Sequence, residues 1–165
     1  MNYIFLDIDG VLNNQNDIIR KHKCNAPHFE AHFCEEAYKT LGKICKKCNA
    51  KVVLSSTWRL GFRNNMQPKE EDIFSQRLLK LFNKYNIDLI GITTLEYLDR
   101  GVQIKKFIKD HLLYHDNYIV IDDEVKNILP YIVKDRVLKI DFKKGLLHKH
   151  IRTCKKMFKK QAKIK

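Results

Sequence analysis

The chain is 165 residues long, and its 44% hydrophobic and 31% charged residues are ordinary for a single globular domain with a buried core. No apolar run is long enough to span a membrane, and the first residues lack the basic start and cleavage site of a signal peptide, so we expect a soluble, cytoplasmic protein. The five cysteines are an odd set, too sparse for a secreted disulfide scaffold, and are expected to be reduced thiols.

Five short apolar runs predict strands, at residues 3–6, 51–55, 88–93, 118–121 and 137–140. Helices are predicted between them, over residues 30–48, 74–85, 100–112 and 124–133, with a last helix over 143–165. Residues 13–30 show little periodicity and are expected to form an irregular flap. Strands that alternate with helices, and that are apolar on both faces, predict a three-layer α/β domain over residues 1–165 with a five-stranded parallel sheet.

The last predicted helix carries much of the net charge of +13, because no acidic residue follows Asp141 while lysines and arginines crowd residues 143–165. Apolar side chains recur there at helical spacing, at Leu147, Ile151, Cys154 and Phe158. The pattern predicts a docked amphipathic helix with a basic outer face. That face is either a contact for a polyanion such as nucleic acid or a solvated surface of a lysine-rich protein.

Two carboxylates end the first strand, in the segment Asp7-Ile8-Asp9-Gly10. Because side chains alternate along a strand, Asp7 and Asp9 are expected on the same side, and Gly10 lets the backbone turn just beyond them. A calcium loop is one alternative, but it would lie between helices and carry its glycine at the sixth position. A strand end with two surface carboxylates and no function is the other alternative.

Polar residues also follow two other predicted strands. Ser55 and Ser56 lie at the end of the second, and Asp122 and Asp123 follow the fourth. Because ligands of parallel sheets bind at the carboxyl ends of the strands, we expect these side chains to meet Asp7 at one edge. Carboxylates that converge in this way repel one another unless a cation neutralises them, and hard oxygen ligands suit Mg²⁺. The sequence therefore predicts a magnesium site that also binds phosphate.

Such a site has the groups that phosphoryl transfer needs. A carboxylate beside the metal can attack phosphorus and form an aspartyl-phosphate. A second carboxylate can protonate the leaving alkoxide and later deprotonate the attacking water. The Ser55 hydroxyl and a cation such as Arg100 can bind the phosphoryl oxygens.

Three segments resemble motifs I, II and IV of the haloacid dehalogenase (HAD) superfamily, at residues 4–12, 52–59 and 118–123. The string from Leu54 to Arg59, and Arg100 with Gly101, resemble in particular the branch called Swiss Army Knife RNA repair phosphatases. The resemblance spans about residues 3–125 with the motifs in the right order. It implies a Rossmann-like HAD fold and phosphatase activity.

The resemblance also implies roles for the acidic residues. Asp7 would be the nucleophile and a Mg²⁺ ligand. Asp9 would be the general acid and base, and would bind the metal through its backbone carbonyl. Asp123, with Asp122 beside it, would be the magnesium-binding acid of motif IV.

For phosphate binding, the resemblance implies the hydroxyl of Ser55, with Ser56 next to it. The cation of motif III is expected to be Arg100, with Lys105 and Lys106 as alternatives. The segments between the motifs leave no room for a large cap domain, and an open site favours a bulky substrate. Together with the basic charge, this favours phosphorylated nucleic-acid ends, RNA or DNA, or nucleotides. The alternatives are a phosphatase of a phosphoprotein or small metabolite, and a non-catalytic nucleic-acid-binding protein.

Two further features allow more than one interpretation. Cys45 and Cys48, with the upstream residues His22, Cys24, His28, His32 and Cys34, are either zinc ligands or small buried hydrophobes, and the irregular spacing favours the second. Trp58 and Arg59 either support the fold or reach the substrate. No feature of the sequence predicts an oligomeric state.

Overall fold

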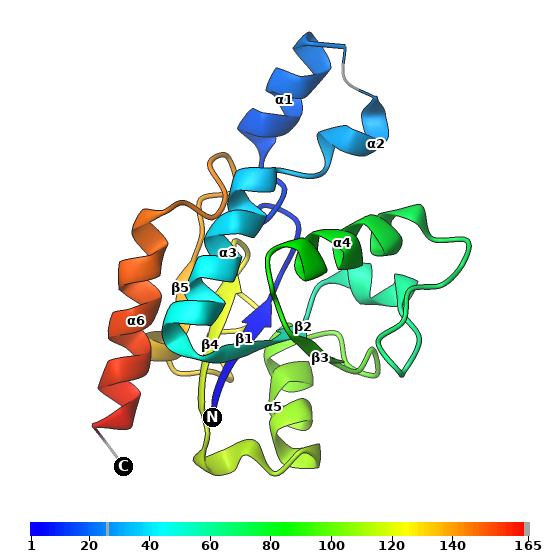
Figure 1. Ribbon diagram of the computed structural model, residues 1–165. Helices are drawn as coiled ribbons and strands as arrows, with labels where there is room; N and C mark the ends of the chain where they lie inside the picture. The colour runs from blue at the N-terminus through cyan, green and yellow to red at the C-terminus, as the bar shows by residue number, and fades with distance from the viewer. Residues whose placement is uncertain (26, 164–165) are drawn as a thin grey trace.

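Five parallel strands form the sheet of the protein, as its computed structural model shows for residues 1–25 and 27–163 (Figure 1). They are β1 (Asn2–Leu6), β2 (Ala50–Leu54), β3 (Leu89–Ile92), β4 (Asn117–Asp122) and β5 (Val137–Lys139). The strand order is β3-β2-β1-β4-β5, and every neighbouring pair is parallel. The predicted three-layer α/β fold with a five-stranded parallel sheet is confirmed.

The central strand β1 is buried on both of its faces. Ile4 and Leu6 belong to one hydrophobic core, and Phe5, which lies between them, belongs to a second core on the opposite face. All three side chains are 0% exposed. Burial on both faces explains why the strand is continuously apolar in sequence instead of alternating.

Helices cover the two faces of the sheet. The apolar sides of α3 (Glu35–Cys48), α4 (Ile73–Lys84) and α6 (Lys149–Ala162) belong to the larger core. The opposite face is covered by α5 (Arg100–Asp110) and by buried side chains of the segment after β4, among them Ile128 and Ile132. Short 3-10 helices occur at η1 (Thr57–Gly61), η2 (Leu113–His115) and η3 (Lys134–Arg136). Within residues 1–25 and 27–163, no helix has the length and apolarity that crossing a membrane requires.

Residues 13–30 differ from the prediction, because they contain α1 (Gln15–Lys23) and the start of α2 (His28–Ala31) instead of irregular chain. Asn14 caps the first of these helices, accepting a hydrogen bond from the Asp17 N–H at 2.9 Å. Helix α1 has no buried residue, so an apolar stripe was missing from the sequence pattern. Both helices project beyond the carboxyl ends of the strands (Figure 1). That the segment acts as a flap stays a prediction.

The helix predicted over residues 30–48 is broken into α2 and α3. The Lys21 side chain donates hydrogen bonds to the carbonyls of Glu30 and Phe33, at 2.9 and 2.5 Å. These bonds satisfy carbonyl groups that a continuous helix would have paired internally. The break therefore depends on a contact from another part of the chain.

Two other predicted helices are shorter than expected or absent. Residues 126–131 form successive turns instead of a helix, since Pro130 has no N–H and restricts the residue before it. Helix α6 begins at Lys149 instead of residue 143. Gly145 precedes it with φ +65, a left-handed conformation that interrupts a helix, and the next residue, Leu146, donates to the carbonyl of Val11 at 2.8 Å.

Candidate active site

The polar ends of β1, β2 and β4 lie at one edge of the sheet. β1 lies between the other two, and the strand hydrogen bonding continues just past their ends. The Ser55 N–H donates to the Leu6 carbonyl at 2.9 Å, and the Asp7 N–H donates to the Ile121 carbonyl at 3.0 Å. The parallel register therefore brings the predicted motifs together, as the rule for the carboxyl ends of parallel strands requires.

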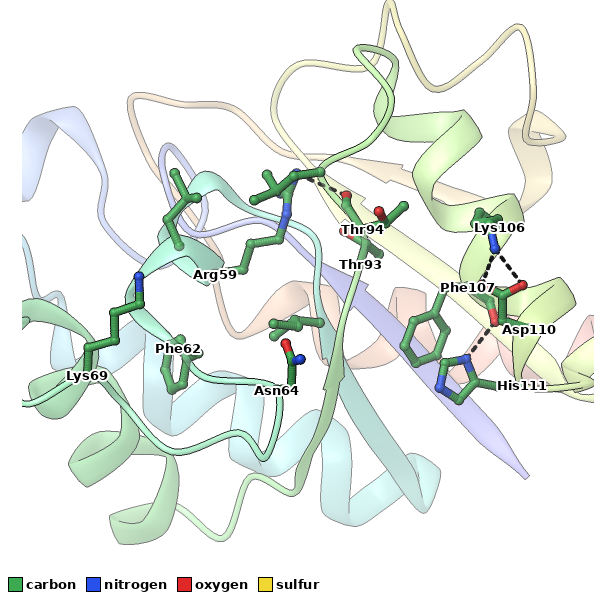
Figure 2. Close-up of a pocket in the computed structure, with 13 residues that line it drawn as sticks. Arg59, Phe62, Asn64, Lys69, Thr93, Thr94, Lys106, Phe107, Asp110 and His111 are labelled. Carbon is green, nitrogen blue, oxygen red and sulfur yellow. Dashed lines mark hydrogen bonds and ion pairs between the residues drawn. The ribbon is translucent and has the colours of Figure 1, made fainter.

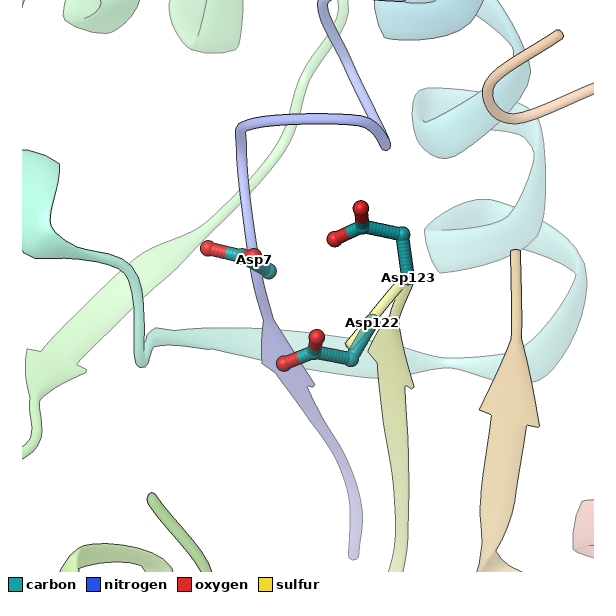
Figure 3. Close-up of side chains that lie close together, drawn as sticks. All are labelled: Asp7, Asp122 and Asp123. Atoms are coloured by element: carbon teal, nitrogen blue, oxygen red, sulfur yellow. The ribbon is translucent and has the colours of Figure 1, made fainter. Parts of the chain in front are cut away.

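Asp7, Asp122 and Asp123 form an acidic cluster at this edge (Figure 3). Each contributes a carboxylate oxygen, and the three oxygens lie within 4.8 Å of one another. Asp7 is 4% exposed and Asp122 is 0% exposed. In the described ranges 1–25 and 27–163, this is the only group of three or more His, Cys, Asp or Glu residues with that geometry.

Gly10 makes room for the cluster. Its φ is +70, and a Cβ at this position would lie 2.5 Å from the carboxyl carbon of Asp123. Both the backbone conformation and the space therefore require glycine. The glycine turn after the first strand is the reason that the motif IV carboxylate can approach motif I so closely.

Arg100, the first residue of α5, is the cation that reaches the cluster. Its guanidinium lies 2.8 Å from an Asp7 carboxylate oxygen and also pairs with Asp122. Burial opposes the charge of Arg100, but Asp7 and Asp122 together raise its pKa above the ordinary value. The pKa values of Asp122 and Asp123 are also raised, mainly by burial and secondly by the Asp7 carboxylate.

The donor set of the cluster fits a hard divalent cation. Three carboxylate groups converge there, and one arginine compensates only part of their charge. Oxygen ligands of this kind are those that Mg²⁺ prefers, and a small cation would relieve the repulsion among the three carboxylates.

The two serines of motif II differ in their surroundings. Both are 0% exposed. The Ser55 hydroxyl oxygen is buried without a hydrogen-bond partner among the described residues. Ser56 instead accepts a hydrogen bond from the Trp58 N–H at 3.5 Å, as the cap of η1. Because a buried hydroxyl without a partner is unfavourable, the Ser55 side chain has a free capacity to bind a ligand.

Arg59 lies under the motif II loop and is 4% exposed. Its guanidinium donates to the carbonyls of Ser55 and Ser56, both at 2.7 Å, and to the side chain of Gln103 at 3.0 Å. Burial, and secondly the charge of Arg100, lower the pKa of Arg59 to about 10. Arg59 therefore supports the motif II loop. Of the two roles considered from the sequence, support of the fold and contact with the substrate, these contacts favour the first.

Asp9 is exposed and stands outside the acidic cluster. Asn13 donates to one of its carboxylate oxygens at 2.7 Å. The indole N–H of Trp58 lies 3.1 Å from both oxygens. These donors hold the carboxylate in one orientation. The sequence did not predict the contact between Asp9 and Trp58, because the two residues are 49 positions apart.

Comparison with known families agrees with this geometry. A model of the family described as "HAD domain in Swiss Army Knife RNA repair proteins" matches residues 3–151. The chain belongs to this family. The superfamily and the branch expected from the motifs are confirmed. No curated protein and no solved structure shows significant similarity to the chain.

The other candidates for the motif III cation lie elsewhere in this HAD domain. Lys106 lines a separate cavity of about 430 Å³ between the motif II loop and α5, where it pairs with Asp110 at 2.6 Å (Figure 2). Lys105 is exposed, and its ammonium lies 6.0 Å from the centre of the Tyr131 ring. Of the three candidates, Arg100 has the contacts with Asp7 and Asp122.

The cysteine pair of α3 packs in the core of the HAD domain. Cys45 and Cys48 are 4% and 7% exposed, and burial raises both thiol pKa values, that of Cys45 to about 12. Neither belongs to a group of three or more metal-ligating residues in the described part of the chain. The pair therefore has the surroundings of buried hydrophobic residues.

Proposed function

We propose that this HAD domain is a Mg²⁺-dependent phosphomonoesterase that works through an aspartyl-phosphate on Asp7. The proposal is carried by one juxtaposition: the acidic cluster, two of whose three aspartates are buried, the Arg100 guanidinium and the unpartnered Ser55 hydroxyl meet at the carboxyl edge of the sheet. A metal-binding group, a cation and a free hydroxyl together match a phosphate ester better than they match a neutral substrate.

The proposed metal ligands are the side chains of Asp7, Asp122 and Asp123 and the backbone carbonyl of Asp9. When bound, Mg²⁺ neutralises the negative charge that the carboxylates and a phosphate bring together. The Ser55 hydroxyl and Arg100 donate to the phosphoryl oxygens and hold the phosphorus against Asp7. Ser56 would contribute to the same phosphate site through the backbone of the loop.

The reaction proceeds in two displacements. The Asp7 carboxylate attacks phosphorus, and the bond to the ester oxygen breaks as Asp9 donates a proton to that oxygen. Aspartyl-phosphate and a free hydroxyl result. Water, deprotonated by Asp9, then attacks the phosphorus, which releases phosphate and restores the Asp7 carboxylate. Trp58 and Asn13 support both steps because they orient the Asp9 carboxylate.

The substrates that we propose are phosphorylated nucleic-acid ends or nucleotides. The family is described from RNA repair proteins, and the chain has a net charge of +13. The loop before the basic helix α6 also lies against the motif I loop, since the Leu146 N–H donates to the Val11 carbonyl at 2.8 Å, and against the start of α1, since the Asn16 N–H donates to the Lys143 carbonyl at 3.0 Å. The segment that leads into α6 therefore lies beside the motif I loop, and we propose that the exposed lysines and arginine of α6 attract a polyanion toward this end of the molecule.

Phosphate release from a panel of substrates tests the proposal. The panel contains 3′- and 5′-phosphorylated RNA and DNA oligonucleotides, mononucleotides, a phosphopeptide and a sugar phosphate, each with and without Mg²⁺. We expect Mg²⁺-dependent release from the nucleic-acid substrates, and none from the Asp7→Asn variant. Faster release from the phosphopeptide or the sugar phosphate would instead indicate a phosphatase of a phosphoprotein or of a small metabolite. Nucleic-acid binding without phosphate release from any ester would show a non-catalytic binding protein.

A charge-reversal pair tests the basic helix. Lys155→Glu with Lys156→Glu changes exposed residues of α6, and Lys80→Glu with Lys109→Glu lowers the net charge equally at exposed positions of α4 and α5. We expect only the first variant to weaken oligonucleotide binding and to make it less dependent on salt. Equal effects of both variants would show that net charge alone attracts the substrate.

A further inference from the structure

A cavity of about 420 Å³ opens beside Asp9. Its lining includes Asp9 itself, and the rest comes from three separate segments: the turn after α2, η1 and the start of α4. Four of the lining residues bear on which ligand the cavity can bind: His32, Trp58, Asp72 and Phe74. Because Asp9 is the proposed donor to the leaving oxygen, the cavity lies on the side where the leaving group of a bound ester would extend.

Aromatic rings form two adjoining walls of this cavity. The rings of Trp58 and Phe74 have centroids 5.6 Å apart and planes at 89°. Trp58 is fixed by its hydrogen bonds to Asp9, and Phe33 supports it from the core, with centroids 5.7 Å apart. His32 packs against Phe74 at 5.7 Å. The rings of Trp58 and Phe74 are each only partly buried, so aromatic surface remains available to a flat ligand.

The Asp72 carboxylate is one of the polar groups that line the cavity. One oxygen of Asp72 accepts the Ser75 N–H at 2.9 Å and caps α4. No hydrogen bond from the described residues reaches the other oxygen. Gly61 brings the backbone of η1 against this carboxylate, because a Cβ there would lie 2.2 Å from the second oxygen. The cavity thus offers aromatic surface together with a fixed acceptor for N–H groups.

We propose that this cavity binds the nucleobase of the nucleotide whose phosphate lies at Asp7, an inference that rests on the proposed function. A base presents a flat π face to the aromatic walls and N–H groups to Asp72. A phenol ring, as in phosphotyrosine, would stack equally well but has no N–H group for Asp72. The excess of positive charge on the chain also favours a nucleotide.

Trp58 provides a direct measurement, because it is the only tryptophan of the chain. The Asp7→Asn protein is titrated in Mg²⁺ with adenosine 3′-monophosphate and 5′-monophosphate, with ribose 5-phosphate as the ligand without a base and with O-phosphotyrosine. We expect saturable quenching of tryptophan fluorescence by at least one of the two nucleotides, and none by ribose 5-phosphate. Equal quenching by the base-free ligand, no quenching by either nucleotide, or tighter binding of phosphotyrosine would overturn the inference.

Phe74→Leu separates the base site from the reaction itself. The readout is the ratio of kcat/KM for the preferred nucleotide to kcat/KM for ribose 5-phosphate. Since loss of stacking on one aromatic side chain weakens binding of a base by roughly fivefold or more, we expect this ratio to fall at least about fivefold. Phe142→Leu, at an exposed phenylalanine outside the cavity, is the matched control and should leave the ratio unchanged.

The two hypotheses fail in different ways. An unchanged ratio in Phe74→Leu, with Mg²⁺-dependent turnover intact, would overturn the base site without contradicting the proposed phosphatase activity.

Asp72→Asn tests the carboxylate of the cavity. It keeps the oxygen that caps α4 and replaces the second acceptor with a donor, so it should weaken nucleotide binding with little change in melting temperature. Unchanged nucleotide affinity in that variant would remove Asp72 from the base site.

Discussion

Gly10→Ala tests whether the close approach of motif I and motif IV builds the metal site. Alanine at φ +70 costs about 1–2 kcal/mol of stability, because the left-handed conformation brings Cβ too close to the backbone. For a chain of this size, the melting temperature should fall by roughly 2–8 °C. The new methyl group would also lie 2.5 Å from the Asp123 carboxyl carbon, so this carboxylate must move.

Gly145→Ala is the matched control. Gly145 has φ +65, and a Cβ there would meet Asn14 and the Val11 carbonyl, both at 2.9 Å. This variant is expected to lose a similar amount of stability without displacing Asp123. Comparison of the two alanine variants therefore separates the strain of a left-handed residue from the loss of the metal site.

The assay is thermal unfolding with and without Mg²⁺, followed by phosphate release. At a Mg²⁺ concentration about 100 times Kd, binding stabilises the native state by about 2.7 kcal/mol, or roughly 5–11 °C. We expect the wild type and Gly145→Ala to show this increase and Gly10→Ala to lose most of it, together with activity. A full Mg²⁺ shift in Gly10→Ala, or an equal loss in both variants, would refute the reasoning.

The remaining predictions concern buried groups outside the acidic cluster. Burial raises the thiol pKa values of Cys45 and Cys154 to about 12, so both stay protonated below that pH. In the folded protein a thiol reagent should modify exposed Cys24 quickly, while these two react slowly without acceleration between about pH 7 and 9; fast modification would contradict their burial. Arg59→Met should lower the unfolding free energy by about 2–4 kcal/mol in a denaturant titration, because the carbonyl of Ser55 and that of the next residue lose their donors. A loss below about 0.5 kcal/mol would argue against this support of the loop.

Local patterns were sufficient to predict the sheet and the acidic cluster. Apolar runs flanked by polar turns identified all five strands, and the rule for the carboxyl ends of parallel strands brought Asp7, Ser55 and Asp122 to one edge. These features depend on short segments and on one topological regularity, so neighbouring residues carry enough information.

Features that depend on distant contacts were not predictable. The break between α2 and α3 is stabilised by Lys21, and the orientation of Asp9 depends on Trp58, which is 49 positions away. Helix α1 lacks a buried face, so the sequence showed no apolar stripe for it. In each case tertiary contacts or capping, rather than periodicity, decide the local structure.

Chemical trapping of the proposed intermediate tests the central claim most directly. The wild-type protein is mixed with the substrate that it hydrolyses fastest in Mg²⁺, quenched in acid during turnover and treated with borohydride, which reduces an acyl phosphate to the alcohol. Peptide mass analysis should then find Asp7 converted to homoserine, and only in samples that contained substrate. Active enzyme that yields unmodified Asp7 and a reduced carboxylate at another position would contradict the assignment of Asp7 as the nucleophile.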